Sequence, residues 1–179
     1  MNEADDDILV KQCLSGNKQA FEAVVDKYQQ PLFNVAYRFL DCFEDAEDVT
    51  QTVFIKAFEK LHTYNNRYKL FSWLYKIAVH ESLNYRNARK PNQTLNENIV
   101  SKDATPEKSY NQRELAKNMG DALNRLKDEY RIVIILKHYQ DLSYEEMSKI
   151  LEIPVKTVKS RLFTARQQLR EILVQGMYI

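Results

Sequence analysis

Near the end of the sequence, cations alternate with short polar side chains. The cations are Lys156, Lys159, Arg161, Arg166 and Arg170. No acid lies between Glu152 and Glu171. Lys and Arg neutralise phosphates, and the hydroxyl groups of Thr157, Ser160 and Thr164 can donate to or accept from base edges. This combination predicts a surface that reads duplex DNA through the major groove.

Two short helices joined by a turn would position this surface. Ser143 and Glu146 have the spacing of a capping box, in which the two residues pair the free N–H groups at a helix start. Pro154 suits the first turn of the second helix, because its φ is fixed and it has no N–H. The apolar residues at helical spacing are Met147, Ile150 and Leu151, then Val158, Leu162, Ala165 and Leu169. A solvated hairpin with a basic face is the alternative, and the acid-free second helix favours DNA binding.

A second stretch, residues 64–90, alternates aromatic rings with cations. These are Tyr64, Tyr68, Phe71, Trp73, Tyr75 and Tyr85 beside Arg67, Lys69, Lys76, Arg86, Arg89 and Lys90, with Glu81 as the single acid. Aromatic planes beside cations hold unstacked single-stranded bases, and each stack contributes about 1–3 kcal/mol. The spacing of a core face is shared by Phe71, Leu74, Ile77 and Ala78. Trp73 fits either role, whereas we expect Tyr64, Tyr68 and His80 to face bases.

An acidic helix is expected before this stretch, over residues 45–61. The apolar side chains expected to face inward are Ala46, Val49, Val53, Phe54, Ala57, Phe58 and Leu61. The outward side is expected to begin with Glu44, Asp45, Glu47 and Asp48. Acids in a first turn suit the helix dipole, which contributes about 0.3–1 kcal/mol for each. A docking surface for a basic partner is the alternative role of these carboxylates.

The composition predicts an all-α fold of two small helical domains. Of 179 residues, 44% are hydrophobic and only 3 are Gly and 4 Pro, which disfavours a fold rich in turns and strands. We expect helices over 6–14 and 18–40, the latter kinked at Pro31. Residues 132–136 have the composition of a buried strand, but a short buried helix capped by Asp128 fits better.

A polar linker is expected between the two domains. Residues 91–105 are polar and begin with Pro91, which is typical of a flexible segment. Thr105 and Pro106 have the order of a cap and a first-turn proline, so we expect a helix to start there. The domains are therefore placed at 1–90 and 111–179, with the linker over 91–110.

The formal charge of +1 hides an uneven distribution of charge along the chain, because residues 1–62 contain twice as many acids as bases.

Cys13 and Cys42 are too far apart for a metal knuckle or a redox pair, so we expect both to be reduced core residues. The sequence has no Gly-rich phosphate loop and no recognisable catalytic set, so no enzyme activity, metal or cofactor is predicted. Neither a signal peptide nor a membrane-spanning run is evident, so we expect a soluble cytoplasmic protein without membrane insertion.

Two segments resemble RNA polymerase sigma factors of the extracytoplasmic-function type. DAEDVTQTVFIKAFEKL (45–61) followed by FSWLYKIAVHESLNYRNARK (71–90) resembles their region two. LSYEEMSKILEIPVKTVKSRLFTARQQLR (142–170) resembles their region four, a helix-turn-helix. The resemblance implies a protein that binds core RNA polymerase, directs it to specific promoters and promotes transcription initiation. It also implies an anti-sigma partner.

The resemblance implies three sets of site residues. Core polymerase docking falls to Asp45, Asp48, Gln51, Thr52 and Ile55. Melting of the minus-ten element and capture of a flipped non-template base fall to Lys56, Lys60, Tyr64, Trp73, Lys76, His80, Asn84 and Arg86. Reading of the minus-thirty-five element as duplex falls to Lys156, Thr157, Lys159, Ser160, Arg161, Phe163, Thr164 and Arg166. In the last set, Arg161 and Arg166 fit phosphate contacts or positions flanking the core.

Four positions depart from the family pattern. His80 stands where Asn is common, Thr52 replaces an acid, and Thr164 replaces a frequent Arg, so base preferences do not carry over. Glu152 takes a turn position that is often Gly and is expected to have a positive φ. The rival functions are a stand-alone helix-turn-helix regulator and a scaffold that binds only proteins. A stand-alone regulator would leave the acidic helix and the aromatic-basic stretch without a role. A scaffold would leave the basic second helix of the helix-turn-helix without one.

Overall fold

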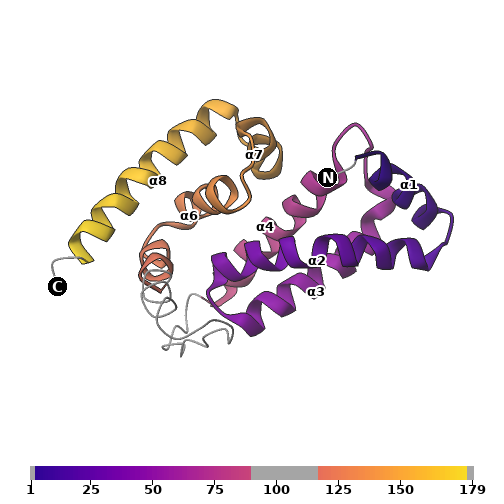
Figure 1. Cartoon of the computed structure of the whole chain (residues 1–179), viewed down its shortest axis with the longest axis horizontal. Coiled ribbons are helices and arrows are strands. Elements are labelled where there is room, and N and C mark those ends of the chain that lie inside the picture. Colours follow the sequence, from indigo (N-terminus) through magenta and orange to yellow (C-terminus); the bar gives the residue numbers. More distant parts are fainter. Residues whose placement is uncertain (1–2, 90–116, 177–179) are drawn as a thin grey trace, which may run out of the picture.

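The computed structural model describes residues 3–89 and 117–176. The first part contains α1 (Glu3–Leu14), α2 (Lys18–Leu40), α3 (Phe43–Lys60), the short 3-10 helix η1 (Leu61–Thr63) and α4 (Leu70–Arg89). The second contains a helical segment at 117–124, α6 (Asp128–Ile134), the π-helical turn η2 (Ile135–Tyr139), α7 (Tyr144–Leu151) and α8 (Val155–Gly176). Neither described part contains a strand, so the all-α prediction is confirmed (Figure 1). The predicted linker at 91–105 and the helix start at Thr105 lie outside the described residues.

Local interactions determine both ends of the long helix α2. The Asn17 side chain accepts a hydrogen bond from the Gln19 N–H at 3.0 Å, which caps the helix start. The helix continues through Pro31 and is followed by Asp41, whose φ of 59° is left-handed. Its buried stripe runs along Val24, Tyr28, Leu32, Val35, Ala36 and Phe39.

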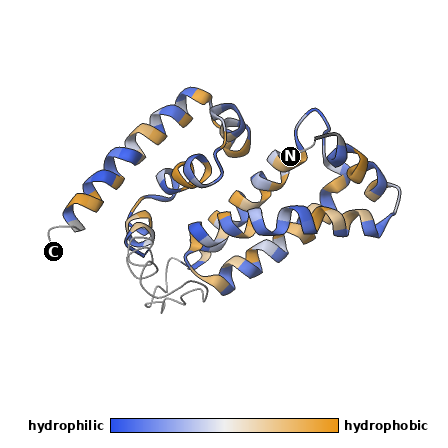
Figure 2. Cartoon of the chain, viewed as in Figure 1, coloured by the Kyte–Doolittle hydropathy of each residue, from blue (hydrophilic) through white to orange (hydrophobic). Residues whose placement is uncertain are grey.

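α2, α3 and α4 pack together, and α1 covers one end of α2 (Figure 1). Hydrophobic and hydrophilic residues both recur along α2, α3 and α4, as amphipathic helices require (Figure 2). Asp6 of α1 accepts a hydrogen bond of 2.7 Å from the hydroxyl of Tyr28 and forms an ion pair with Lys27. The buried hydroxyl therefore has a partner, and this pairing fixes α1 on the bundle.

The apolar run 132–136 is fully buried and helical, so the predicted buried helix is confirmed and the strand is excluded. It forms the end of α6 and the start of η2, and α6 packs against α8. The prediction that Asp128 caps this helix is wrong by one position. Lys127 is the cap residue, and Asp128 is the first helical residue, where a carboxylate still suits the helix dipole.

Two predictions of inward-facing residues also need correction. Phe58 is 58% exposed, because it lies at the edge of the buried stripe of α3, and its ring packs edge-on against Phe21 at 5.0 Å. On α4, Phe71 and Ile77 are only half-buried, whereas Tyr75 is fully buried beside Leu74. The core face of α4 is therefore turned from the predicted one, because α7 as well as α2 and α3 covers this helix.

Candidate nucleic-acid interface

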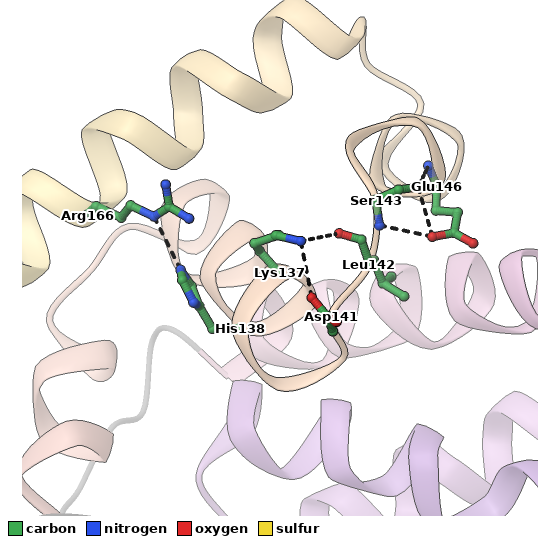
Figure 3. Close-up of polar contacts among 7 residues, drawn as sticks. All are labelled: Lys137, His138, Asp141, Leu142, Ser143, Glu146 and Arg166. Atoms are coloured by element: carbon green, nitrogen blue, oxygen red, sulfur yellow. Dashed lines mark hydrogen bonds and ion pairs between the residues drawn. The ribbon is translucent and has the colours of Figure 1, made fainter.

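The helix-turn-helix has the predicted local geometry. The Glu146 N–H donates to Ser143 Oγ at 3.2 Å, and the Ser143 N–H donates to Glu146 Oε2 at 2.9 Å, which confirms the capping box (Figure 3). Glu152 ends α7 with a φ of 54°, which confirms the expected left-handed conformation. Pro154 lies just before α8, and its carbonyl accepts from the Thr157 N–H at 2.8 Å. The turn therefore begins α8 without a proline inside the helix.

Lys137 stabilises the segment that leads into the helix-turn-helix. Its ammonium donates to the Leu142 carbonyl at 3.1 Å and forms an ion pair with Asp141 at 3.3 Å (Figure 3). Asp141 itself has a positive φ of 49°. These contacts stabilise the irregular segment between η2 and α7, and they orient the start of α7.

α8 buries one face and exposes the other, as predicted. Val158, Leu162 and Ala165 are fully buried and Leu169 is half-buried. The exposed members of the predicted minus-thirty-five set are Lys156, Lys159, Ser160, Phe163 and Arg166, and the half-buried members are Thr157, Arg161 and Thr164. Phe163 is 64% exposed, and an apolar side chain among hydroxyls and cations can contact a thymine methyl group. All eight residues therefore lie on one helix with their cations largely in solvent.

Two cations of α8 also contact the helices below it. Arg161 forms an ion pair with Glu129 of α6 at 2.9 Å. Arg166 Nε donates to His138 Nε2 at 3.3 Å (Figure 3). Burial and the neighbouring cations Arg166 and Lys137 lower the pKa of His138, which keeps its imidazole neutral and able to accept. These contacts fit the predicted position of Arg161 and Arg166 beside the core.

An aromatic pair forms where η1 leads into α4. The rings of Tyr64 and Trp73 lie 5.6 Å apart and are inclined by 59°. The Tyr64 hydroxyl donates to the Tyr68 carbonyl, which fixes the intervening loop. Both rings are half-buried, so each is supported by the core and still presents a surface on which a base can stack.

Glu81 joins two members of the predicted minus-ten set. Lys56 forms an ion pair with its carboxylate at 2.6 Å, and His80 Nδ1 lies 3.5 Å from the other oxygen. The Asn84 side-chain amide lies 3.1 Å from the same His80 nitrogen. Burial raises the pKa of Glu81, but the hydrogen bonds from Lys56 and His80 outweigh it, so the pKa lies below its ordinary value. Sequence reasoning missed this role, although Glu81 was visible as the single acid of the stretch.

The structure does not bring every predicted minus-ten residue to one place. Arg86 forms an ion pair with Asp128 at 2.9 Å and donates to the Phe39 carbonyl at 3.2 Å. It lies ten residues beyond Lys76 on α4, a distance of about 15 Å along the helix. Lys76 is itself paired with Glu152 at 2.7 Å, whereas Lys60 is exposed at the end of α3. Arg86 is therefore separate from the aromatic pair.

The prediction that Asp45 lies on the outward side of the acidic helix is wrong. Its side chain is buried, accepts a hydrogen bond of 2.8 Å from Tyr85 and is paired with Arg89. Burial, together with the hydrogen bond to Asp45, raises the pKa of Tyr85 to about 12, so the phenol remains a donor. Asp45 faces inward because it shares the helix side of Val49, and a basic residue of α4 compensates its charge.

Of the other residues predicted to dock polymerase, Gln51 and Ile55 line a groove between α2 and α3, whereas Asp48 and Thr52 are not among its lining residues. Asp48, Gln51 and Ile55 are exposed along one side of α3, and Thr52 is half-buried. The groove has a volume of about 690 Å³ and is lined by Val25, Gln29, Gln30, Phe33, Phe43, Glu47, Thr50, Gln51, Phe54 and Ile55. Phe43 and Ile55 are exposed large hydrophobic residues, and such patches commonly mark interaction sites. On α2 the groove is lined by Val25 and Phe33, which lie next to the buried residues of that helix. Apolar residues beside a buried stripe are the sequence signal that could have indicated this groove.

Other kinds of site find no support in the part of the chain that the structure describes. Cys13 and Cys42 are free thiols, and burial raises the pKa of each. Within residues 3–89 and 117–176, no group of His, Cys and acidic residues could hold a metal ion. Among the helices described there, none is long and apolar enough to cross a membrane.

Comparisons with known proteins agree on one family. Residues 24–91 match the family model described as Sigma-70 region 2, and residues 116–169 match Sigma-70, region 4. The chain is 32% identical over 176 residues to the ECF RNA polymerase sigma factor SigW of Bacillus subtilis (strain 168), covering 92% of this chain and 94% of that protein.

Two solved structures are similar over most of the chain. One is CnrH in complex with the cytosolic domain of CnrY, with a TM-score of 0.74, 26% identity, and coverage of 96% of this chain and 98% of that chain. The other is the sigma factor RpoE from Bartonella quintana in complex with the anti-sigma factor NepR. It has a TM-score of 0.69 and 25% identity, and covers 86% of this chain and 96% of that chain.

Proposed function

Because this chain belongs to the extracytoplasmic-function (ECF) RNA polymerase sigma factors, we propose that its two helical parts divide promoter recognition between them. As a sigma factor, the chain is a non-enzymatic initiation factor that binds core RNA polymerase and promoter DNA. One observation carries the proposed division: an aromatic pair in a basic stretch lies in the first part, and a helix with exposed cations and no acid before Glu171 lies in the second. Residues 1–90 and 111–179 form the two domains of this proposal, and 91–110 connect them.

In the second domain, α8 enters the major groove of the minus-thirty-five element. Lys156 and Lys159 meet phosphates, while Thr157 and Ser160 meet base edges. The exposure of Lys156, Lys159 and Ser160 on α8, with Thr157 half-buried beside them, supports this assignment. Phe163 supplies an apolar contact, and Thr164 lies at the rim with its side chain half-buried.

In the first domain, Tyr64 and Trp73 form the platform for an unpaired base of the minus-ten element. Flipping a base out of a duplex costs a few kcal/mol, and stacking at about 1–3 kcal/mol per base offsets that cost. His80 is exposed and is held by Asn84 and Glu81, which suits a polar contact to the edge of the base.

The groove between α2 and α3 is the proposed dock for core polymerase. An amphipathic helix fits such a groove with its apolar side inward, and a basic rim on that helix would meet Glu47 and Asp48. Exposed Phe43 and Ile55 support an apolar contact. Asp48→Arg should weaken capture of the chain by immobilised core polymerase about tenfold, and Glu22→Arg, on α2 outside the groove, is the matched control. Undiminished capture of the Asp48 variant would refute this dock.

An anti-sigma protein is a further proposed partner. The RpoE structure that resembles this chain is a complex with the anti-sigma factor NepR, and it covers 86% of this chain. We place the protein in the cytoplasm, because core polymerase and promoter DNA are there.

Run-off transcription with purified bacterial core polymerase and a genomic promoter library tests the proposed function. The chain should direct initiation from a limited set of sequences, and core polymerase alone should not. If no template yields a transcript while the chain binds duplex DNA as a dimer, it is a stand-alone helix-turn-helix regulator instead.

A further inference from the structure

Two ammonium groups lie beside the ring of Tyr144, the first residue of α7. The ammonium of Lys159 on α8 lies 5.3 Å from the centre of the ring, and that of Lys137 in η2 lies 5.9 Å from it. An ammonium within about 6 Å of the centre of an aromatic ring is attracted by the negative face of that ring. Tyr144 therefore attracts one cation from the element before α7 and one from the helix after it.

The two lysines are held in different ways. Lys137 is anchored by the Leu142 carbonyl at 3.1 Å and by the carboxylate of Asp141 at 3.3 Å. Lys159 is exposed, and within residues 3–89 and 117–176 it has no ion pair or hydrogen bond besides its contact with the ring. The ring of Tyr144 is therefore the contact that restrains the charge of Lys159.

Tyr144 itself is held in place. It directly follows Ser143, whose capping box with Glu146 stabilises the start of α7, and its half-buried ring packs against the hydrophobic core. Fixing a tyrosine ring costs little conformational entropy, because the side chain rotates about only two bonds. The ring therefore offers a rigid surface to the flexible side chain of Lys159.

A second cation of α8 contacts the segment that precedes α7. Arg166 Nε donates to His138 Nε2 at 3.3 Å, and His138 directly follows Lys137 in the π-helical turn η2 (Figure 3). Lys159 and Arg166 are separated by about two helical turns, so they lie on the same side of α8. π-Helical turns are rare and frequently occur at functional sites. Residues 137–144 therefore contact α8 cations at two places along one side of the helix.

We propose that Tyr144 is a positioning residue for duplex recognition, whose ring restrains the ammonium of Lys159 so that α8 presents this charge to a DNA phosphate. The inference rests on the proposed function, which assigns Lys159 to a phosphate of the minus-thirty-five element. The anchored ammonium of Lys137 repels that of Lys159, which directs the latter away from the turn and toward solvent.

The benefit to binding is entropic. A lysine side chain has one of the largest rotamer entropies of any residue, and a free lysine loses much of this freedom when it meets a phosphate. Lys159 is already restrained before DNA arrives, so it loses less. Tyr144 therefore strengthens a phosphate contact without carrying the charge that makes it.

The first test measures binding of a short, fluorescein-labelled, randomised DNA duplex to the full chain by fluorescence anisotropy at low salt. Phosphate contacts do not depend on sequence, so a randomised duplex reports them. Tyr144→Leu should weaken binding about threefold, which is the size of an exposed cation–π contact. Tyr144→Phe keeps the ring and should bind as the wild type does. An equal loss in both variants would overturn the proposal, because it would assign the effect to the hydroxyl group.

A double-mutant cycle separates this role from an effect on folding. In a Lys159→Gln background, Tyr144→Leu should cause no further loss of affinity, because the ring has no ammonium to restrain. In a Lys156→Gln background it should still weaken binding about threefold. Lys156 is the matched control, since it is an exposed cation of α8 with no ring contact among the described residues. Equal losses in the two backgrounds would overturn the proposal, because Tyr144 would then act on the fold and not through Lys159.

The two single lysine variants separate this inference from the proposed function. Lys156→Gln and Lys159→Gln should each weaken binding to the duplex, because each removes a phosphate contact. If neither changes the affinity, the assignment of α8 to duplex DNA fails and the role of Tyr144 fails with it. If both weaken binding while Tyr144→Leu binds as the wild type does, only the role of Tyr144 is rejected.

Discussion

The two candidate DNA surfaces differ in how their cations are held. On α8, Lys156 is exposed and the ammonium of exposed Lys159 lies 5.3 Å from the centre of the Tyr144 ring, and no acid lies among their neighbours in sequence. Around α4, Lys56 is paired with Glu81 and Lys76 with Glu152. Exposed cations suit a duplex, whose phosphates are regularly spaced, whereas oriented side chains suit a single extruded base. Lysine side chains therefore suit duplex binding on α8, where no carboxylate of the described residues pairs with Lys156 or Lys159, and binding of a single base near α4, where carboxylates orient Lys56 and Lys76.

The largest expected effect separates strand opening from duplex binding. Tyr64→Ala removes one ring of the platform and should cost about 1–3 kcal/mol in the open complex, because a base loses its stacking surface. Permanganate reactivity of unpaired thymines should fall, while initial duplex binding changes little. Tyr64→Phe keeps the ring and should stay close to the wild type. Equal reactivity of the alanine variant and the wild type would remove Tyr64 from the minus-ten site.

The next effect concerns the oriented cations. Glu81→Gln should lower the free energy of unfolding by about 1–2 kcal/mol, because the carboxylate is largely buried and accepts a charged hydrogen bond from Lys56. Urea denaturation followed by circular dichroism measures the change. Glu22→Gln, at an exposed position of α2, should be nearly neutral. If the two variants are equally stable, Lys56 is not held by Glu81 in solution.

A smaller effect is expected on α8. Lys159→Glu should weaken binding to promoter duplex by about 1 kcal/mol and reduce the slope of log affinity against log salt by about one. Lys117→Glu makes the same charge change at an exposed residue away from α8. A titration at several salt concentrations compares the two variants, and an identical loss in both would place the effect in overall charge.

The smallest effect is a pH dependence at the base of α8. Burial, Arg166 and Lys137 lower the pKa of His138, so the folded chain binds a proton there less readily than the unfolded chain. The stability from neutral His138 is complete above about pH 6.5 and is lost as the pH falls through the lowered pKa. Between pH 7.5 and 5.5 the Tm of His138→Gln, whose amide oxygen can still accept from Arg166, should therefore fall less than the Tm of the wild type. If the Tm of the variant falls as much as that of the wild type, other groups cause the pH dependence.

Local rules predicted the local features of this fold. The capping box, the left-handed Glu152 and the buried face of α8 each depend on residues within a few positions, so the sequence contains them directly. The inward position of Asp45 was missed because its partner Arg89 lies 44 residues away. The pairing of Lys76 with Glu152 joins two domains and has no signal in spacing. The site residues themselves stay predictions, and the structure has changed which of them share a surface.

The left-handed backbone at Glu152 bears on attempts to engineer a more robust protein. A residue with a Cβ in this conformation costs about 1 kcal/mol relative to glycine, so Glu152→Gly is an obvious thermostabilising substitution. The same change would delete the carboxylate that meets Lys76. A gain in heat tolerance at this position would thus be offset in part by the loss of the ion pair that joins α4 to the end of α7.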